Sequence, residues 1–325
     1  MEIRKSLCRA RQFGGINLFL KYVSMGLGAL VLRNALKMLL GIMTRDEAYA
    51  SISYAANREL ILKYKDFICE RKKYYDSLIN MEQKRPDKVF VSWLQGFDAA
   101  PELVKVCVAS MKRCLTDREI ILLSLDNCHK YAELPNDIVR KFKEGKIPPA
   151  LFSDLLRLEL LIRHGGIWMD ATVLCTEGKY PKEIMDCDLF VFQAITKGKH
   201  QLHGISNWFI TACSNNKLLM VLRDVLIRYW RDYNCTVDYY IFHHFFCYIA
   251  RLYPENVAAM PRKNRLLPLQ LMKRMGDRYE QKWMEEIKSR TCFHKLNYRL
   301  DSKILDNKDN FYHAIIKENA FLCLS

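Results

Sequence analysis

The sequence predicts an α/β protein: a mixed, mostly parallel sheet flanked by helices, with an N-terminal helical extension. From residue 87 onward, short runs rich in β-branched and aromatic residues alternate with segments of helical period, which is the pattern of parallel strands joined by helices. Before residue 86 the pattern is helical throughout. Half of the 325 residues are apolar and 27% are charged. This composition supports a sizeable core and argues against a disordered or collagen-like chain.

The extension, residues 1–85, begins with an apolar stretch over 14–43 that is interrupted by Lys21, Arg33 and Lys37. Its longest uncharged piece, 22–32, is too short to span a bilayer. Two interpretations stay open: a helix that packs against the rest of the protein, or an interfacial helix with its basic residues near lipid headgroups. A second helix is expected over 44–75, solvated on one side.

A domain over 86–300 and a C-terminal tail over 301–325 follow. The elements expected in the domain are a strand at 87–94, a helix that begins at Pro101, a strand at 118–125, a helix that ends at Gly145, a helix at 150–164, strands at 167–175 and 188–194, and a mainly helical region after Asn207.

Composition and motifs exclude several classes of protein. The net charge is +15, and residues 1–85 hold 16 Lys and Arg against 8 Asp and Glu, a net of +8, which favours an anionic partner. The 12 cysteines form no C-x-x-C pair, so we expect free thiols in a reducing cytosol. We expect neither a secretory signal nor a membrane-spanning helix. No P-loop, dinucleotide-binding glycine motif, G-x-S-x-G elbow or H-E-x-x-H is present.

Two features of the segment 150–170 indicate a polar site. Asp154 and Arg157 share a face of the predicted helix with leucines, whereas Glu159 and Arg163 form its solvated stripe. A buried charge needs a partner, so the pair either neutralises itself or lines a cleft that binds ligand. Asp170 ends the following strand, where open α/β sheets bind ligands. Carboxylate oxygens there would suit Mg²⁺ or Mn²⁺.

The segments "VSWLQGFDAAPELVKVCVASM" and "SDLLRLELLIRHGGIWMDATVLCT" resemble the capsular polysaccharide synthesis glycosyltransferases. These are similar to transferases that share a D-x-x-R … GG-[IV]-[WY]-x-D-x-[DT] pattern, including a yeast mannosyltransferase and clostridial toxins that transfer glucose. The resemblance covers residues 88–180 strongly, and "DYYIFHHFF" and "CFHKL" more loosely. It implies a GT-A fold, a nucleotide-sugar donor and a divalent metal.

The resemblance also implies roles for single residues. Trp93 would stack on the nucleotide base, although an ordinary core tryptophan is the alternative. Asp154 would bind hydroxyls of the donor sugar, and Arg157 would lie near the sugar or phosphate. The other residues expected to bind the nucleotide sugar are Gln95, Gly96 and Gly166.

The metal would be Mn²⁺ or Mg²⁺, held at the position of the family's D-x-D motif. Here that motif reads Asp170-Ala171-Thr172, so a neutral hydroxyl replaces the second carboxylate. His294, in "CFHKL", is the candidate for a further ligand, and the alternative is a structural histidine.

Two further segments are candidates for the acceptor site. Asp238, with His243 or His244 after it, is assigned a catalytic or acceptor-binding role, and the alternative is a capping residue. Asn207 and Trp208 are weaker candidates for facing the acceptor.

Together these observations predict a metal-dependent, retaining glycosyltransferase of the hexosyltransferase type. It would move a sugar from a nucleoside diphosphate sugar to a polysaccharide or lipid-linked oligosaccharide, in the cytoplasm or on the inner face of the membrane. We expect no nucleic-acid partner, since charge alone favours one. The alternative function is a non-catalytic membrane-surface scaffold of a polysaccharide assembly complex.

Overall fold

The computed structural model describes residues 15–79, 81–176, 180–194, 202 and 204–316. It divides into two compact units. The first contains residues up to 81, 134–159 and 217–253, and the second contains 82–133, 160–216 and the chain from 254 onward. The first unit therefore combines most of the expected extension with two segments of the expected domain over 86–300. Residues 1–14 of the extension and 317–325 of the tail lie outside the described residues.

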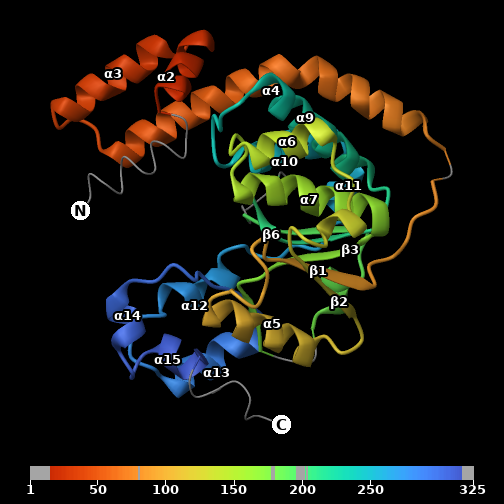
Figure 1. Ribbon diagram of the computed structural model, residues 1–325, viewed down its shortest axis with the longest axis vertical. Helices are drawn as coiled ribbons and strands as arrows, with labels where there is room; N and C mark the ends of the chain where they lie inside the picture. The colour runs from red at the N-terminus through yellow and green to blue at the C-terminus, as the bar shows by residue number, and fades with distance from the viewer. Residues whose placement is uncertain (1–14, 80, 177–179, 195–201, 203, 317–325) are drawn as a thin grey trace. The chain divides into compact units, whose positions relative to one another are not determined.

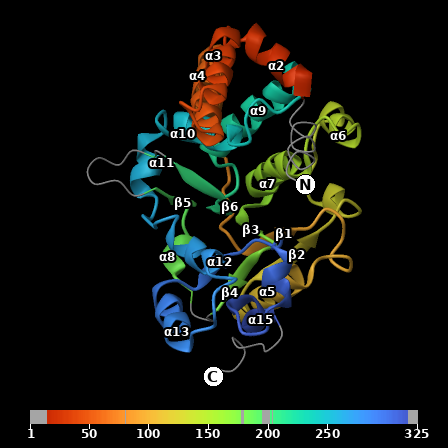
Figure 2. The same cartoon turned by 90° about the vertical axis from the view of Figure 1, so that its left-hand side faces the viewer.

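The first unit is helical. Figure 1 shows α2 and α3 as a pair of helices beside the beginning of the long helix α4, and Figure 2 shows the same group from the side. Thr44 caps α4 in a capping box with Glu47, which fixes where the helix begins. Among the described helices, none is long and apolar enough to cross a bilayer. The helices are α2 (Gly15–Ser24), α3 (Gly28–Leu39), α4 (Arg45–Ser77), α6 (Asn136–Lys143), α9 (Lys217–Asp232), α10 (Ile241–Ala250) and the larger part of α7 (Pro149–His164).

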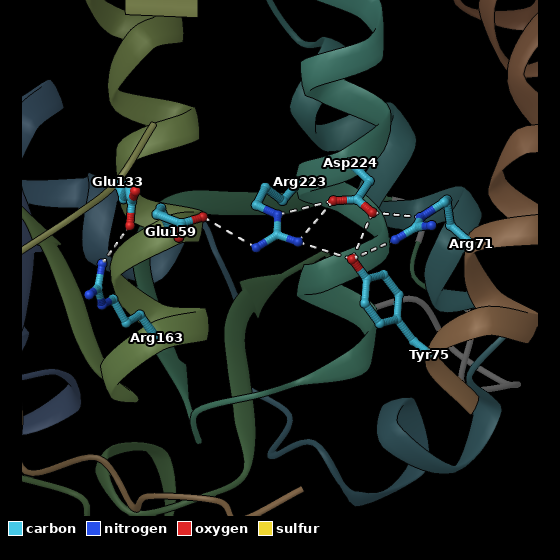
Figure 3. A network of polar contacts seen from close by, with 7 residues as sticks. All are labelled: Arg71, Tyr75, Glu133, Glu159, Arg163, Arg223 and Asp224. Atoms are coloured by element: carbon cyan, nitrogen blue, oxygen red, sulfur yellow. Dashed lines mark hydrogen bonds and ion pairs between the residues drawn. The ribbon is translucent and has the colours of Figure 1, made fainter. Parts of the chain in front are cut away.

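A polar network joins α4, α9 and α7 (Figure 3). The Asp224 carboxylate accepts hydrogen bonds at 2.7 Å from Arg71 Nε and from the Tyr75 hydroxyl. Arg223 donates to the Tyr75 hydroxyl at 3.0 Å and reaches Glu159 Oε2 at 3.3 Å. Only 15% of the Glu159 side chain is exposed. The prediction that Glu159 lies on a solvated stripe of α7 is thus wrong, because Arg223 of α9 covers the Glu159 side chain.

The second unit contains the sheet. In the part of this unit that the structure describes, its strands are β1 (Lys88–Ser92), β2 (Glu119–Leu123), β3 (Gly166–Asp170), β5 (Leu189–Gln193) and β6 (Ile205–Ala212), in the order β2-β1-β3-β6-β5. The pairs β1–β2 and β1–β3 are parallel, while β6 is antiparallel to both its neighbours. All these strands except β6 therefore run in one direction. The predicted α/β fold with a mixed, mostly parallel sheet is confirmed.

Two expected elements differ from the structure. The region after Asn207 begins within strand β6, not with a helix. Its continuous run of aromatic and β-branched residues, buried at nearly every position, is that of a strand between two neighbours. The expected strand 167–175 is two strands, because β4 (Val173–Cys175) leaves the main sheet and pairs with β7 (Phe293–Lys295). The turn between β3 and β4 consists of Ala171 and Thr172.

In Figure 1, the helices α5, α12, α13 and α15 of the second unit lie on one side of this sheet. They share a core in which Leu103 and Cys107 of α5 meet Leu174 of β4 and Phe311 of α15. The segment assigned to a tail thus folds into the core up to Ile316. The elements are η1 (Cys128–Lys130), α5 (Glu102–Cys114), α8 (Lys182–Met185), α11 (Pro254–Ala259), η2 (Leu267–Leu269), α12 (Gln270–Lys273), α13 (Gln281–Arg290), α14 (Ser302–Asp306) and α15 (Phe311–Ile316).

Candidate functional site

The carboxyl ends of β1 and β3 lie side by side in the second unit. These strands are parallel, and their register pairs Ser92 with Asp170. Trp93, the next residue after β1, therefore follows at the same edge as Asp170. This is the edge at which ligands bind in open α/β sheets.

Both carboxylate oxygens of Asp170 have partners. Trp168 Nε1 donates to Oδ1 at 3.0 Å, and Lys295 Nζ lies 2.9 Å from Oδ2. The same ammonium donates to Thr172 Oγ1 at 2.5 Å. The side chains of Asp170 and Lys295 stay 28% and 20% exposed, so a ligand can reach this pair.

Strand β7 brings Lys295 to the turn between β3 and β4. Its register with β4 pairs Lys295 with Val173 and His294 with Leu174. The backbone N–H of Leu296 then donates to the Thr172 carbonyl at 2.9 Å. Because side chains alternate along a strand, Lys295 and His294 point to opposite faces of β7, and it is Lys295 that faces Asp170.

His294 is completely buried on the other face. Its Nε2 lies 3.1 Å from the Thr176 hydroxyl. Burial, with a smaller contribution from Lys288, lowers the pKa of its imidazole to about 3. The ring is neutral at physiological pH, and its contacts are those of a structural histidine.

The residues predicted to hold a metal do not form one ligand set. His294 faces away from Asp170, Thr172 offers a neutral oxygen, and the Lys295 ammonium contacts both Asp170 and Thr172. No group of three or more His, Cys, Asp or Glu side chains that could hold an ion occurs among the described residues. This arrangement does not fit Mn²⁺ or Mg²⁺, which need several oxygen ligands and no ammonium among them.

Trp93 belongs to an aromatic pair at the same edge. It is half-buried, and its ring meets that of Tyr298 edge to face, with centroids 5.1 Å apart. Gln95 is exposed, and Gly96 has a φ of +87°, which suits its turn after β1. Trp93 is therefore neither a fully exposed platform nor an ordinary core residue.

Gly165 and Gly166 have a packing role that needs no ligand. Both have positive φ, and a Cβ on Gly166 would lie 2.9 Å from the Lys88 carbonyl oxygen and from the Phe90 ring. Gly165 also ends α7, with its N–H bound to the Leu161 carbonyl. At these two glycines the backbone closely approaches other parts of the protein's own chain.

Asp154 and Arg157, in the first unit, form the buried ion pair that was one of the two interpretations. Arg157 Nη1 lies 3.2 Å from Asp154 Oδ1, and the side chains are 6% and 8% exposed. Arg157 also donates to the Ser153 carbonyl at 3.3 Å and lies over the Phe242 ring. The pairing explains how two charges persist among leucines; a role towards the donor sugar stays a prediction.

Asp238, also in the first unit, forms hydrogen bonds with side chains of helix α4. Its carboxylate accepts from the hydroxyls of Ser53 at 2.7 Å and Tyr49 at 3.2 Å, and from the Asn57 amide. It also accepts from the Tyr240 N–H just before α10.

These hydrogen bonds set the charge of Asp238. Burial alone would raise its pKa, but the bonds from His244, Ser53, Asn57 and the Tyr240 backbone hold the pKa well below its usual range. Three of the donors belong to α4, and the N-cap of α10 is Tyr240, so Asp238 joins α4 to the start of α10, and a catalytic role stays a prediction.

The remaining acceptor candidates lie in the sheet. Trp208 of β6 is buried and stacks on Phe192 at a centroid distance of 4.9 Å. Asn207, its neighbour, is half-buried. A cavity of about 380 Å³ elsewhere in the second unit is lined by residues that include Tyr180, Lys263 and Phe293. It contains none of the predicted site residues.

Sequence reasoning missed Lys295 and Tyr298, both of which contact predicted site residues. A signal for Lys295 is present in "FHK": in a strand, a histidine and the lysine after it face opposite sides. Tyr298 follows the strand in an irregular segment, for which no periodic pattern predicts a contact.

Residues 39–315 match the family described as "Capsular polysaccharide synthesis protein". The chain belongs to this capsular polysaccharide synthesis family. The match includes every predicted site residue, and the expected family is confirmed.

Other comparisons add little to the family match. No curated protein matches the sequence. Among solved structures, the chain is similar to one titled "PaToxG Glycosyltransferase", with 15% identity and a TM-score of 0.35 over 62% of this chain and 79% of that one.

Proposed function

We propose that this capsular polysaccharide synthesis protein is a glycosyltransferase with a GT-A type domain. It transfers a hexose-type sugar from a nucleoside diphosphate sugar to a polysaccharide or lipid-linked oligosaccharide. The observation that carries the proposal is the edge formed by β1 and β3, where an acid, a cation and an aromatic pair come together.

Each part of this edge suits one part of the donor. The faces of Trp93 and Tyr298 offer stacking surface for a planar base. Asp170 and Lys295 offer an acceptor and a donor of hydrogen bonds to the sugar and diphosphate. The resemblance assigns the donor-sugar hydroxyls to Asp154 and a position near the sugar or phosphate to Arg157, and it implies retention of anomeric configuration.

A panel of nucleotide sugars tests the proposal by nucleotide release and by transfer to oligosaccharide acceptors. At a concentration of 100 times its dissociation constant, the correct donor should add about 2.7 kcal/mol of stability. Asp170→Asn should lower turnover about 10²- to 10³-fold, as expected for a polar group at a reacting centre. Asp137→Asn, on the surface of α6, is the control. If no nucleotide sugar stabilises the protein, the scaffold alternative is favoured.

We further propose that α2 and α3 bind an anionic membrane surface on the cytoplasmic side. Leu32, Leu36 and Leu39 lie on one face of α3 and are 62%, 57% and 85% exposed. Arg33 and Lys37 flank this stripe on the same helix, and residues 3–45 contain no Asp or Glu. An apolar stripe bordered by cations is the pattern of an interfacial helix.

A further inference from the structure

We infer that the ammonium of Lys295, and not a divalent cation, is the positive charge that faces the diphosphate of the donor. This inference rests on the proposed transferase function and concerns the same edge of the sheet. It starts from the two contacts of one side chain: Lys295 Nζ lies 2.9 Å from Asp170 Oδ2 and 2.5 Å from Thr172 Oγ1.

The ammonium of Lys295 lies at the position that a metal ion bound to Asp170 and Thr172 would take. An ion held by the first and third residues of Asp170-Ala171-Thr172 would share Thr172 Oγ1 with Lys295, and it would either share Asp170 Oδ2 with the same ammonium or compete with Trp168 Nε1–H for Oδ1. Like charges repel most strongly where water is partly excluded, and the Lys295 side chain is only 20% exposed. The lysine and an ion therefore compete for one position.

The charges of Asp170, Thr172 and Lys295 suit a site in which the cation is a lysine side chain. Asp170 carries one negative charge, Lys295 one positive charge, and Thr172 none. A second carboxylate in place of Thr172 would leave the cluster with an excess negative charge, which a divalent ion could neutralise and a single lysine could not. The threonine thus suits a site whose cation is a side chain.

The ammonium is held in position and still able to bind ligand. The pairing of β7 with β4 and the hydrogen bond from the Leu296 N–H to the Thr172 carbonyl fix the backbone of Lys295. An ammonium has three N–H donors, and within the described residues two of them have the acceptors named above. The third is available to a phosphate oxygen, for which lysine acts as a point charge.

During transfer, the bond between the anomeric carbon and the diphosphate oxygen breaks, and the electron pair remains on that oxygen. The acceptor hydroxyl forms the new bond to the anomeric carbon and loses its proton to solvent. Negative charge therefore develops on the leaving diphosphate, and a fixed cation beside it stabilises the transition state.

The first test measures binding of UDP and GDP to the full-length protein by calorimetry, in excess EDTA and in Mn²⁺. We expect binding in EDTA, and roughly 10- to 100-fold weaker binding in Lys295→Met, the loss typical of a charged hydrogen bond. Lys295→Arg should restore much of the affinity, whereas Lys303→Met, an exposed lysine on α14, should bind like the wild type.

A second readout follows the binding of Mn²⁺ itself. UDP or GDP alone changes the electron paramagnetic resonance signal of free Mn²⁺ by binding some of the ion. Wild-type protein added with the nucleotide should cause no further change. Thr172→Asp combined with Lys295→Ala should bind Mn²⁺ under the same conditions, because it replaces the ammonium by a second carboxylate.

The outcomes separate the two proposals. Nucleotide binding that requires Mn²⁺ in the wild type, or stoichiometric Mn²⁺ binding by it, overturns the role of Lys295 and leaves the transferase function standing. Absence of UDP and GDP binding together with absence of turnover across the full donor panel overturns both. Binding in EDTA that depends on Lys295 supports both.

Discussion

At the scale of single residues, His294 shows how the fold fixes a charge state. The ring is fully buried, and within the described residues its Nδ1 has no hydrogen-bond partner. Since burial disfavours the imidazolium, the pKa of His294 falls to about 3 in the folded protein, against about 6.5 in an unfolded chain. The folded state therefore binds fewer protons than the unfolded state between these values.

This difference predicts a loss of stability in acid. Stability falls as pH decreases wherever the unfolded state binds more protons, so His294 should contribute a decline that begins near pH 6.5 and continues towards pH 3. A single residue gives at most about 1.4 kcal/mol per pH unit. The free energy of unfolding, measured in urea between pH 7.5 and 5, should depend less on pH in His294→Gln.

The exposed residue His129 provides the control, since His129→Gln should keep the wild-type pH dependence. An unchanged slope in His294→Gln would show that His294 does not titrate in this way and would reopen its role as a ligand.

At the scale of elements, Asp224 joins α4 to α9 (Figure 3), and Asp232 makes a further contact between these helices by accepting from the Tyr64 hydroxyl. The Asp224 side chain is 15% exposed and is contacted by Arg71, Tyr75 and Arg223. Removing it leaves the guanidinium groups of Arg71 and Arg223 close together, and among the described residues Glu159 is the carboxylate that still contacts one of them. The cost should exceed that of an ordinary surface ion pair.

We expect Asp224→Ala to lower the free energy of unfolding by about 2–3 kcal/mol, the range for hydrogen bonds to charged groups that are mostly buried. Asp137→Ala breaks the exposed pair with Arg231, whose side chains are 35% and 52% exposed, and should cost about 0–1 kcal/mol. Urea midpoints at constant m-value give both numbers. Equal costs would mean that the network adds nothing beyond surface pairing.

The elements also show which parts of the fold are predictable. Helices α4, α5 and α7 follow from their periodicity and end signals, because those are local properties. The three-residue strand β7 is too short to give a periodic signal, and its pairing with β4 joins residues more than a hundred positions apart. Asp170 could therefore be chosen from the sequence, whereas its partner Lys295 depends on a long-range register.

At the scale of the whole molecule, positive charge is concentrated near the N-terminus, where residues 1–85 carry a net +8 of the total +15. Not all of these cations are available to a membrane. The Lys21 ammonium lies 3.7 Å from the centroid of the Tyr233 ring, so Arg33 and Lys37 are the cations beside the apolar stripe of α3.

The apolar stripe of α3 and the two cations beside it make lipid binding testable. The protein should bind liposomes that contain anionic lipid, and binding should weaken as salt is raised from 0.05 to 0.5 M (roughly a threefold shorter Debye length) because headgroup attraction is screened. Arg33→Glu with Lys37→Glu should weaken binding about 10-fold or more, at about 1 kcal/mol per cation. Leu36→Asp with Leu39→Asp should weaken liposome binding at every salt concentration, because this change removes the apolar area that the membrane would bury.

Co-sedimentation with liposomes measures the binding of each variant, with Lys303→Glu as the charge control. Equal binding to neutral and anionic vesicles would contradict the role of the cations, and binding to neither would leave α2 and α3 with a packing role alone.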